Sequence, residues 1–204
     1  MVKRSIKFRI TILSLVSILI SMPACNEAMP TKEIKPPAPE VVVVKSDSAQ
    51  VQANITDFLI WYKLHYKTLI AFPILGKNSL GNFMVNKTAY TGFLNFLTRS
   101  NFIAPQYIGL WRIFFEDKEA ELKQNPLRTG IPEGFDFDFV LITAQPQILL
   151  NKIDSIQYNI TSMSDSAALV GVKWPDTNLA EYEFEMFKSK EGWQIGYIST
   201  PNFD

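Results

Sequence analysis

Three side chains stand out as groups that could move a proton or hold a cation. His65 is the only His in the chain, and an imidazole titrates near neutral pH, so it could act as a general base. Asp136 and Asp138 alternate with phenylalanines in the run FDFDF at 135–139. On a strand this alternation would place both carboxylates on one face, about 7 Å apart, where they could bind a hard cation or share a proton.

Each of these side chains also has a structural interpretation, which we favour. His65 falls at the boundary of a predicted amphipathic helix, and the two aspartates fit the solvent face of a strand. Three further polar side chains are weaker candidates for a pocket or partner site, namely Arg112, Gln145 and Tyr158.

The sequence contains none of the common catalytic or nucleotide-binding motifs. It has no GxSxG, HExxH, GxGxxG or GxxxxGK[ST] pattern. Cys25 is the only Cys, which excludes an internal disulfide and a zinc site built on cysteines. We therefore expect no metal and no cofactor, and we favour a domain that is not an enzyme.

The N-terminal segment has the three parts of an export signal. A basic cluster at 3–9 precedes an apolar run at 10–20, and the residues SMPAC follow at 21–25. The apolar run is shorter than the roughly 20 residues that a membrane-spanning helix needs, and Pro23 suits such a helix poorly. Residues 1–24 are therefore predicted to be a signal peptide.

The residues MPAC resemble the lipobox of bacterial lipoproteins, in which a small residue precedes a lipidated Cys. Ala24 and Cys25 fit that pattern. The resemblance implies that Cys25 carries a lipid, becomes the mature N-terminus and holds the protein on a membrane. Asn26 follows in place of the Asp that retains many such proteins in the inner membrane, which favours the outer membrane of the cell envelope. The leaflet remains open.

The charge of the mature chain argues against two classes of partner. The signal peptide holds four of the 20 Lys and Arg residues and none of the 20 Asp and Glu residues, so its removal leaves a net charge of about −4. Nucleic acid and direct adhesion to anionic lipid are therefore poor expectations.

The segment 25–48 reads as a tether. Pro30, Pro36, Pro37 and Pro39 stand among charged residues, a composition that favours extended conformers over packing. The four valines at 41–44 are strand or tether, and the sequence leaves that choice open. The remaining residues, 49–204, have the length and the apolar content of a single domain.

Helices are predicted in the first half of this domain and strands in the second. Helical spacing of apolar residues begins at Ser48 and stops at Phe72-Pro73, with Asp47 or Ser48 as N-cap; residues 76–81 are expected to form a loop. A second helix begins at Asn86, and a third runs from Pro105 to before Asn125. Alternating patterns predict strands at 157–161, 167–173, 182–187 and 193–198. We predict an α+β fold with three helices packed on one side of a curved antiparallel sheet.

The C-terminal hairpin and two longer stretches resemble the nuclear-transport-factor-2-like superfamily. The residues GWQI at 192–195 match the last strand of those domains, after a first helix that contains Trp61 and Tyr62. The stretches YTGFLNFLTRSNFIAPQYI and EGFDFDFVLITAQ are similar to uncharacterised envelope proteins of that superfamily. The resemblance, over about 50–200, implies a cone-shaped sheet with a helix-lined pocket and no particular reaction. It also implies a homodimer through the sheet, which exposed aromatic residues would indicate.

Two functions follow as hypotheses. We favour a lipid-anchored, noncatalytic domain that binds an unidentified protein or small molecule. The alternative is a small cone-fold enzyme, isomerase- or dehydratase-like, in which a carboxylate or His65 transfers a proton. The enzyme would show a buried titratable group with a shifted pKa in a deep apolar pocket. A cone filled by its own side chains would favour recognition at the surface.

Overall fold

The computed structural model describes residues 46–175, 177 and 181–200. The predicted signal peptide, Cys25, the tether up to residue 45 and the valines at 41–44 lie outside the described residues. Among the described residues, no helix combines the length and apolar character needed to cross a bilayer.

Helix α1 spans Asp47–Ile70 and is capped by Ser46, whose hydroxyl accepts from the Ala49 N–H at 3.3 Å. The cap lies one or two residues before the predicted positions. Its buried side chains recur every three or four residues, as the sequence predicted, and form one stripe: Val51, Ile55, Phe58, Leu59, Tyr62 and Leu69.

The segment between the first two helices is a small hairpin, where a loop was expected. Strand β1, Leu75–Lys77, pairs antiparallel with β2, Phe83–Val85. The side-chain oxygen of Asn78 accepts from the backbone N–H groups of Leu80 and Asn82, which stabilises the turn locally. Strands of three residues carry too little alternation to be detected in the sequence.

Helices α2 and α3 begin where the sequence predicted. Helix α2, Lys87–Thr98, is capped by Asn86, and α3, Pro105–Gln124, has Pro105 at its first position. Both residues act on the first turn of their own helix. Asn accepts a hydrogen bond from a free backbone N–H there, and Pro lacks the N–H that would be left unbonded.

The sheet is an antiparallel meander of four strands in the order β3-β4-β5-β6. The strands are β3 Gln157–Met163, β4 Ala167–Lys173, β5 Tyr182–Ser189 and β6 Gly192–Ser199, which confirms the four predicted strands. Buried side chains alternate with exposed glutamates on β5, again as predicted. The predicted class, α+β with helices packed against an antiparallel sheet, is confirmed.

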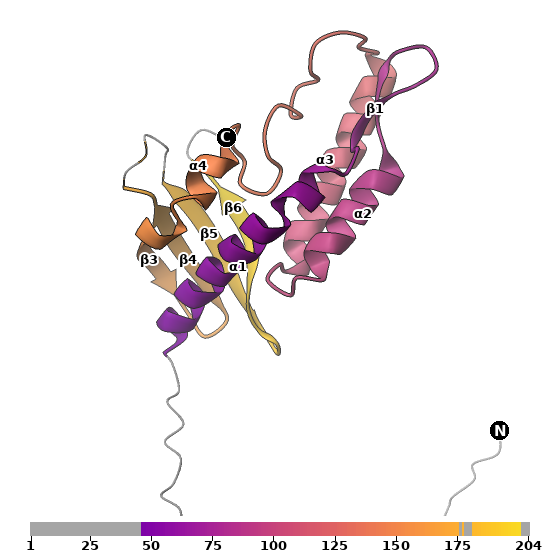
Figure 1. The fold of residues 1–204 in the computed structure, drawn as a ribbon. Helices are drawn as coiled ribbons and strands as arrows, with labels where there is room; N and C mark the ends of the chain where they lie inside the picture. The colour runs from indigo at the N-terminus through magenta and orange to yellow at the C-terminus, as the bar shows by residue number, and fades with distance from the viewer. Residues whose placement is uncertain (1–45, 176, 178–180, 201–204) are drawn as a thin grey trace, which may run out of the picture. The chain divides into compact units, whose positions relative to one another are not determined.

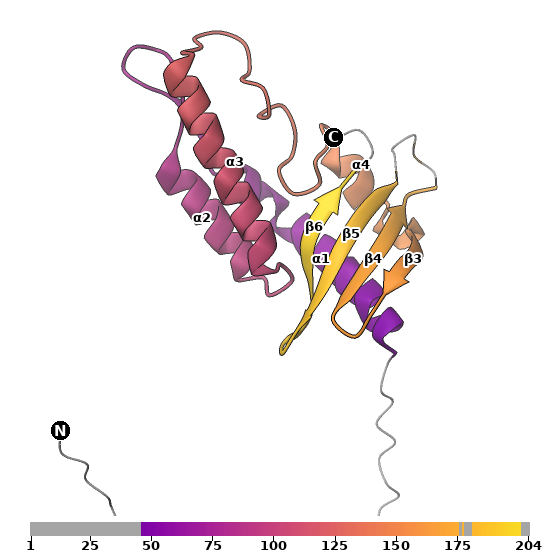
Figure 2. The same cartoon turned by 180° about the vertical axis from the view of Figure 1, so that it is seen from behind.

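The layers are arranged around α1. This helix crosses one face of the sheet, while α2 and α3 lie side by side beyond β6 (Figures 1 and 2). The short helix α4, Pro146–Leu150, and a 3-10 turn, Ile153–Ser155, lead into β3. Lys188 on β5 forms an ion pair with Asp47 at 2.7 Å, which connects the start of α1 to the sheet.

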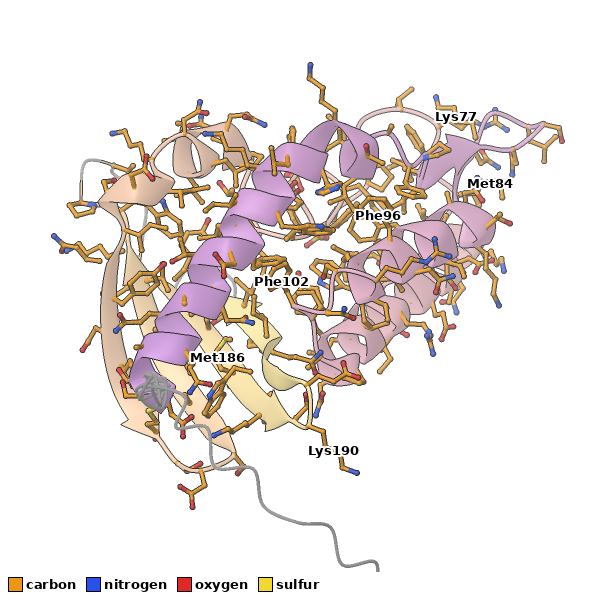
Figure 3. The ribbon with its side chains drawn as sticks, turned by 60° about the horizontal axis from the view of Figure 1, so that its bottom comes forward. Lys77, Met84, Phe96, Phe102, Met186 and Lys190 are labelled. Atoms are coloured by element: carbon orange, nitrogen blue, oxygen red, sulfur yellow. The ribbon has the colours of Figure 1, made fainter. Side chains whose placement is uncertain are left out.

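Large side chains fill the space between α1 and the sheet. Met186 lies beneath α1, and Phe102 lies where α1 approaches α2 and α3 (Figure 3). The sheet contributes a set of side chains that are each at most 3% exposed: Val170, Val172, Trp174, Tyr182, Phe184, Met186, Trp193, Ile195 and Ile198. The interior of the domain is therefore packed with its own residues.

The run FDFDF is not a strand, so the predicted pair of carboxylates on one strand face is wrong. Residues 135–145 form a loop with one isolated bridge, Asp138 to Thr143. Phe139 packs on Phe115 and Trp111 of α3, with ring centroids 5.1 and 5.5 Å apart. The Asp138 side chain bonds backbone N–H groups of its own loop, an alternative to strand pairing that short polar side chains offer.

Candidate functional site

Asp138 lies at the centre of the loop, and three donors hold its carboxylate. One oxygen accepts from the N–H groups of Val140, at 3.0 Å, and Leu141, at 2.7 Å. The other accepts from the Tyr62 hydroxyl on α1, at 2.5 Å. The carboxylate therefore ties the loop to the helix that covers the sheet.

Burial sets the proton affinity of this pair. Loss of hydration raises the pKa of Asp138 above its usual range, although the Tyr62 hydroxyl and the two backbone N–H groups act in the opposite direction. Burial, followed by the negative charge of Asp138, raises the pKa of Tyr62 far above its usual range. Tyr62 therefore keeps its proton and remains a donor.

Besides burial, the charge of the Asp138 carboxylate raises the pKa values of three further tyrosines. Burial raises the pKa of Tyr182 to about 12, and the charge of Asp138 adds to that shift. Tyr66 and Tyr107 also have raised pKa values, mainly from burial, with the charge of Asp138 as a further cause. The Tyr107 hydroxyl donates to the carbonyl oxygens of Phe139, at 3.3 Å, and Val140, at 3.2 Å. Tyrosines thus supply the polar contacts that the loop needs.

A cavity of about 190 Å³ opens beside Asp138 and Tyr62. Its other lining residues are apolar: Leu69, Ile70, Phe72, Ile74, Phe93, Phe137, Phe139 and Val140. Sites for drug-sized ligands usually measure about 300–1,000 Å³. The cavity is small on that scale. A ligand that gave Asp138 a proton there would compete with the three hydrogen bonds that the carboxylate already accepts.

The structure separates the two aspartates. Asp136 is exposed and lines a different hollow of about 440 Å³, which Phe114 and Lys118 also line. A shared proton or a cation held between Asp136 and Asp138 is therefore not supported by the geometry.

His65 belongs to an aromatic cluster with Trp61 of α1 and Phe96 of α2. Its ring stacks on Trp61 at 4.8 Å between centroids and lies 5.6 Å from Phe96. The Nδ1 atom is 2.8 Å from the Trp61 carbonyl oxygen, which can only accept, so Nδ1 carries the hydrogen. His65 therefore has the half-buried boundary position that its structural interpretation predicted.

Two of the weaker candidates lie apart from Asp138. The Tyr158 hydroxyl is hydrogen-bonded to the Thr56 hydroxyl at 2.7 Å, which connects β3 to α1, and burial raises its pKa. Gln145 is exposed and precedes α4 without a side-chain cap bond. Neither lines the cavity beside Asp138.

Arg112 lines an open groove of about 780 Å³. The groove runs between the N-terminal half of α3 and the turn that joins β5 to β6. Its polar lining comes from four segments: Asn95, Thr98, Asn101, Arg112, Ser189, Lys190, Glu191 and Gln194. Lys190 projects from the tip of the β5–β6 turn (Figure 3). The groove offers hydrogen-bond donors, acceptors and both signs of charge to a partner.

Sequence reasoning missed the tyrosines that surround Asp138 and the strain in their loop. Tyr62 and Tyr66 are spaced four residues apart on α1, a spacing that predicts a shared side of the helix but no contact with Asp138. Ile142 has φ +49°, a left-handed conformation that a β-branched residue rarely adopts. No sequence signal marked it, because Gly or Asn is the usual residue there.

Comparisons of the chain with protein-family models, with curated proteins and with solved structures find no match. Within the described ranges, no three His, Cys, Asp or Glu side chains come together as a metal site. The candidate sites therefore rest on geometry alone.

Proposed function

We propose that the chain is an envelope lipoprotein whose folded domain is a noncatalytic recognition module. A diacylglycerol on Cys25 would hold it on a membrane, with the outer membrane favoured by Asn26. Residues 25–45 would act as its tether, because the last positions of the predicted segment, 46–48, belong to the cap and first turn of α1. The partner is a protein or a small molecule that binds in the groove lined by Arg112.

One observation supports recognition over catalysis, namely that side chains fill the space beneath α1. Phe58, Phe184 and Ile195 are each fully buried there, while the groove lined by Arg112 is open to solvent. An enzyme of this architecture needs an interior pocket for its reacting groups. A filled interior leaves the surface for binding.

The cone-shaped, nuclear-transport-factor-2-like architecture with three N-terminal helices is part of the same proposal. Two features support it: α1 lies across one sheet face, and β-bulges interrupt the pairing of β3 with β4 and of β5 with β6. Bulges bend strands and increase their twist. A homodimer through the other sheet face stays a prediction, supported by Tyr197, which is 39% exposed.

The enzyme alternative keeps one specific observation in its favour, the half-buried Asp138 with its raised pKa beside a cavity. The three donors on that carboxylate favour a structural role. Turnover of a small substrate by the wild type, abolished in a folded Asp138→Asn variant, would establish the enzyme.

Photo-crosslinking in intact cells tests the proposal. A photoreactive amino acid replaces Lys190 at the groove or, as a matched exposed control, Asp165 at the β3–β4 turn. We expect a discrete adduct at position 190, reduced in an Arg112→Glu background, and none at 165. Equal adducts at both positions, or none at 190, would contradict recognition in the groove. Mass spectrometry of the mature N-terminus tests the anchor separately, because the diacylglycerol must appear on Cys25.

A further inference from the structure

Charge is distributed unevenly along the described chain. The 58 residues from 58 to 115 contain no Asp or Glu and six Lys and Arg: Lys63, Lys67, Lys77, Lys87, Arg99 and Arg112. The three ion pairs among the described residues all lie outside this stretch. A mature chain with a net negative charge therefore contains a strongly basic part.

The outward side of α1 combines part of this charge with exposed aliphatic side chains. Ile60, Lys63, Leu64 and Lys67 follow the i, i+3, i+4, i+7 spacing that places residues on one side of a helix. The buried stripe of α1 faces the sheet and, at Tyr62, the loop at 135–145, so these four exposed residues point away from both. We call them the outer face of α1. Figure 1 shows α1 as the outermost layer on its side of the sheet.

The exposure of this face is unusual for its composition. Leu64 is 77% exposed and Ile60 is 43% exposed, although a solvent-facing helix position normally carries a polar residue. Ile70, at the end of the same helix, is 57% exposed. Aliphatic side chains flanked by lysines are the composition of helices that lie in the interface of anionic membranes.

We propose that the outer face of α1 lies on an anionic lipid bilayer, with Leu64 and Ile60 inserted among the headgroups and Lys63 and Lys67 on the lipid phosphates. The inference rests on the proposed lipid anchor, since the tether enters α1 directly. Residues 25–45 span at most about 70 Å when fully extended, so the anchor keeps α1 within reach of the bilayer. Net charge predicted that anionic lipid is a poor partner. That prediction averages over the whole chain, whereas the basic residues of 58–115 stand in a stretch without acidic residues.

Lipid quenching of a label on the outer face tests this placement. A fluorescent amino acid replaces Leu64 or, as the control, Asp165 at the exposed β3–β4 turn. The full chain is recovered with vesicles of phosphatidylcholine alone or with added phosphatidylglycerol, both containing lipids with a nitroxide on the acyl chain. We expect quenching at position 64 in the anionic vesicles, weak quenching in the neutral vesicles and none at 165.

Charge variants identify the cause of the contact. Lys63→Glu with Lys67→Glu should lose the quenching at 64, whereas Lys123→Glu with Lys173→Glu, at two exposed positions away from α1 and from the groove, makes the same change in net charge and should retain it. No quenching at 64, equal quenching at 64 and 165, or equal quenching in both kinds of vesicle would overturn the proposal. Binding of an acidic protein, and not of lipid, at position 64 would also overturn the proposed membrane contact.

The proposed lipid anchor on Cys25 and the proposed membrane contact of α1 can be disproved independently of each other. If Cys25 carries no acyl mass, the lipoprotein proposal fails. Co-flotation of that unacylated chain with anionic vesicles, with quenching at 64, would still support the face, and absence of co-flotation would overturn it. If Cys25 is acylated and position 64 stays unquenched, the anchor stands and the proposed contact is wrong.

Discussion

The loop at 135–145 and the sheet at 157–199 are both held against α1, but by different interactions. The sheet is held by apolar burial, with Phe184, Met186 and Ile195 fully enclosed. The loop also buries apolar side chains, Val140 and Leu141, and packs Phe139 on α3. It depends in addition on polar contacts, in which Asp138 receives three donors and Tyr107 donates to two carbonyl oxygens. Apolar burial depends on area removed from water, whereas a buried polar contact depends on every partner being present. Mutations should therefore affect the two regions in different ways.

The largest effect is expected in the sheet. Phe184→Ala removes a fully buried aromatic side chain beneath α1 and should lower the free energy of unfolding by about 3–5 kcal/mol. Urea unfolding followed by circular dichroism measures this loss. An exposed control on the same strand, Glu183→Ala, should change it by less than about 0.5 kcal/mol. Equal effects at 183 and 184 would contradict apolar burial as what holds the sheet.

The next largest effect is expected at the carboxylate of the loop. Asp138→Ala leaves the Tyr62 hydroxyl and two backbone N–H groups without their acceptor, which should cost about 3 kcal/mol in the free energy of unfolding. Asp138→Asn keeps acceptors for the N–H groups and places an amide beside Tyr62. The Asn variant should therefore unfold at nearly the wild-type urea concentration at neutral pH. An Ala variant as stable as the Asn variant would rule out the anchoring role.

The pH dependence of the free energy of unfolding separates the effect of the Asp138 charge from the effect of its side-chain shape. The folded pKa of Asp138 is raised, so its contribution to stability is fully present below the unfolded value of about 4 and is lost as the pH rises through the folded pKa. Asp138→Asn lacks this loss. The stability of the Asn variant relative to the wild type should therefore increase as the pH rises from below 4 towards 7, measured by urea unfolding at each pH. A difference that stays constant with pH would show that burial does not disfavour the charge.

The smallest effects are expected for the hydroxyl groups of two buried tyrosines, Tyr62 and Tyr90. Tyr62→Phe removes the hydroxyl that donates to the half-buried Asp138 carboxylate and should cost about 2 kcal/mol of unfolding free energy. The Tyr90 hydroxyl is buried without a hydrogen-bond partner among the described residues. Tyr90→Phe should therefore leave the free energy of unfolding unchanged or raise it by up to about 1 kcal/mol. Thermal melts of both variants measure the contrast, and a larger loss for Tyr90→Phe than for Tyr62→Phe would reverse the account.

The same difference explains which parts of the fold the sequence predicted. The strand at 182–189 begins with buried Tyr182, Phe184 and Met186 alternating with exposed Glu183 and Glu185, and the residue types themselves show that alternation. The helix starts at Asn86 and Pro105 were found because capping is local.

The loop followed rules that the sequence does not display. FDFDF has the alternation of a strand, but Phe139 packs on α3 and Asp138 bonds its own backbone and Tyr62. Those partners are distant in the sequence, so alternation alone predicted the wrong element. The candidate site was lost for the same reason: the paired aspartates were separated, and the tyrosines around Asp138 were not recognised.

The central claim is that recognition takes place in the open groove while the half-buried Asp138 carboxylate only maintains the fold. Photo-crosslinking at position 190 in the Asp138→Asn variant tests it most directly, because this variant should retain stability and lose the charge. We predict the same adduct, in the same amount, as in the wild-type background. Loss of the adduct from an Asn variant that is as stable as the wild type would contradict the claim, since the carboxylate would then take part in function.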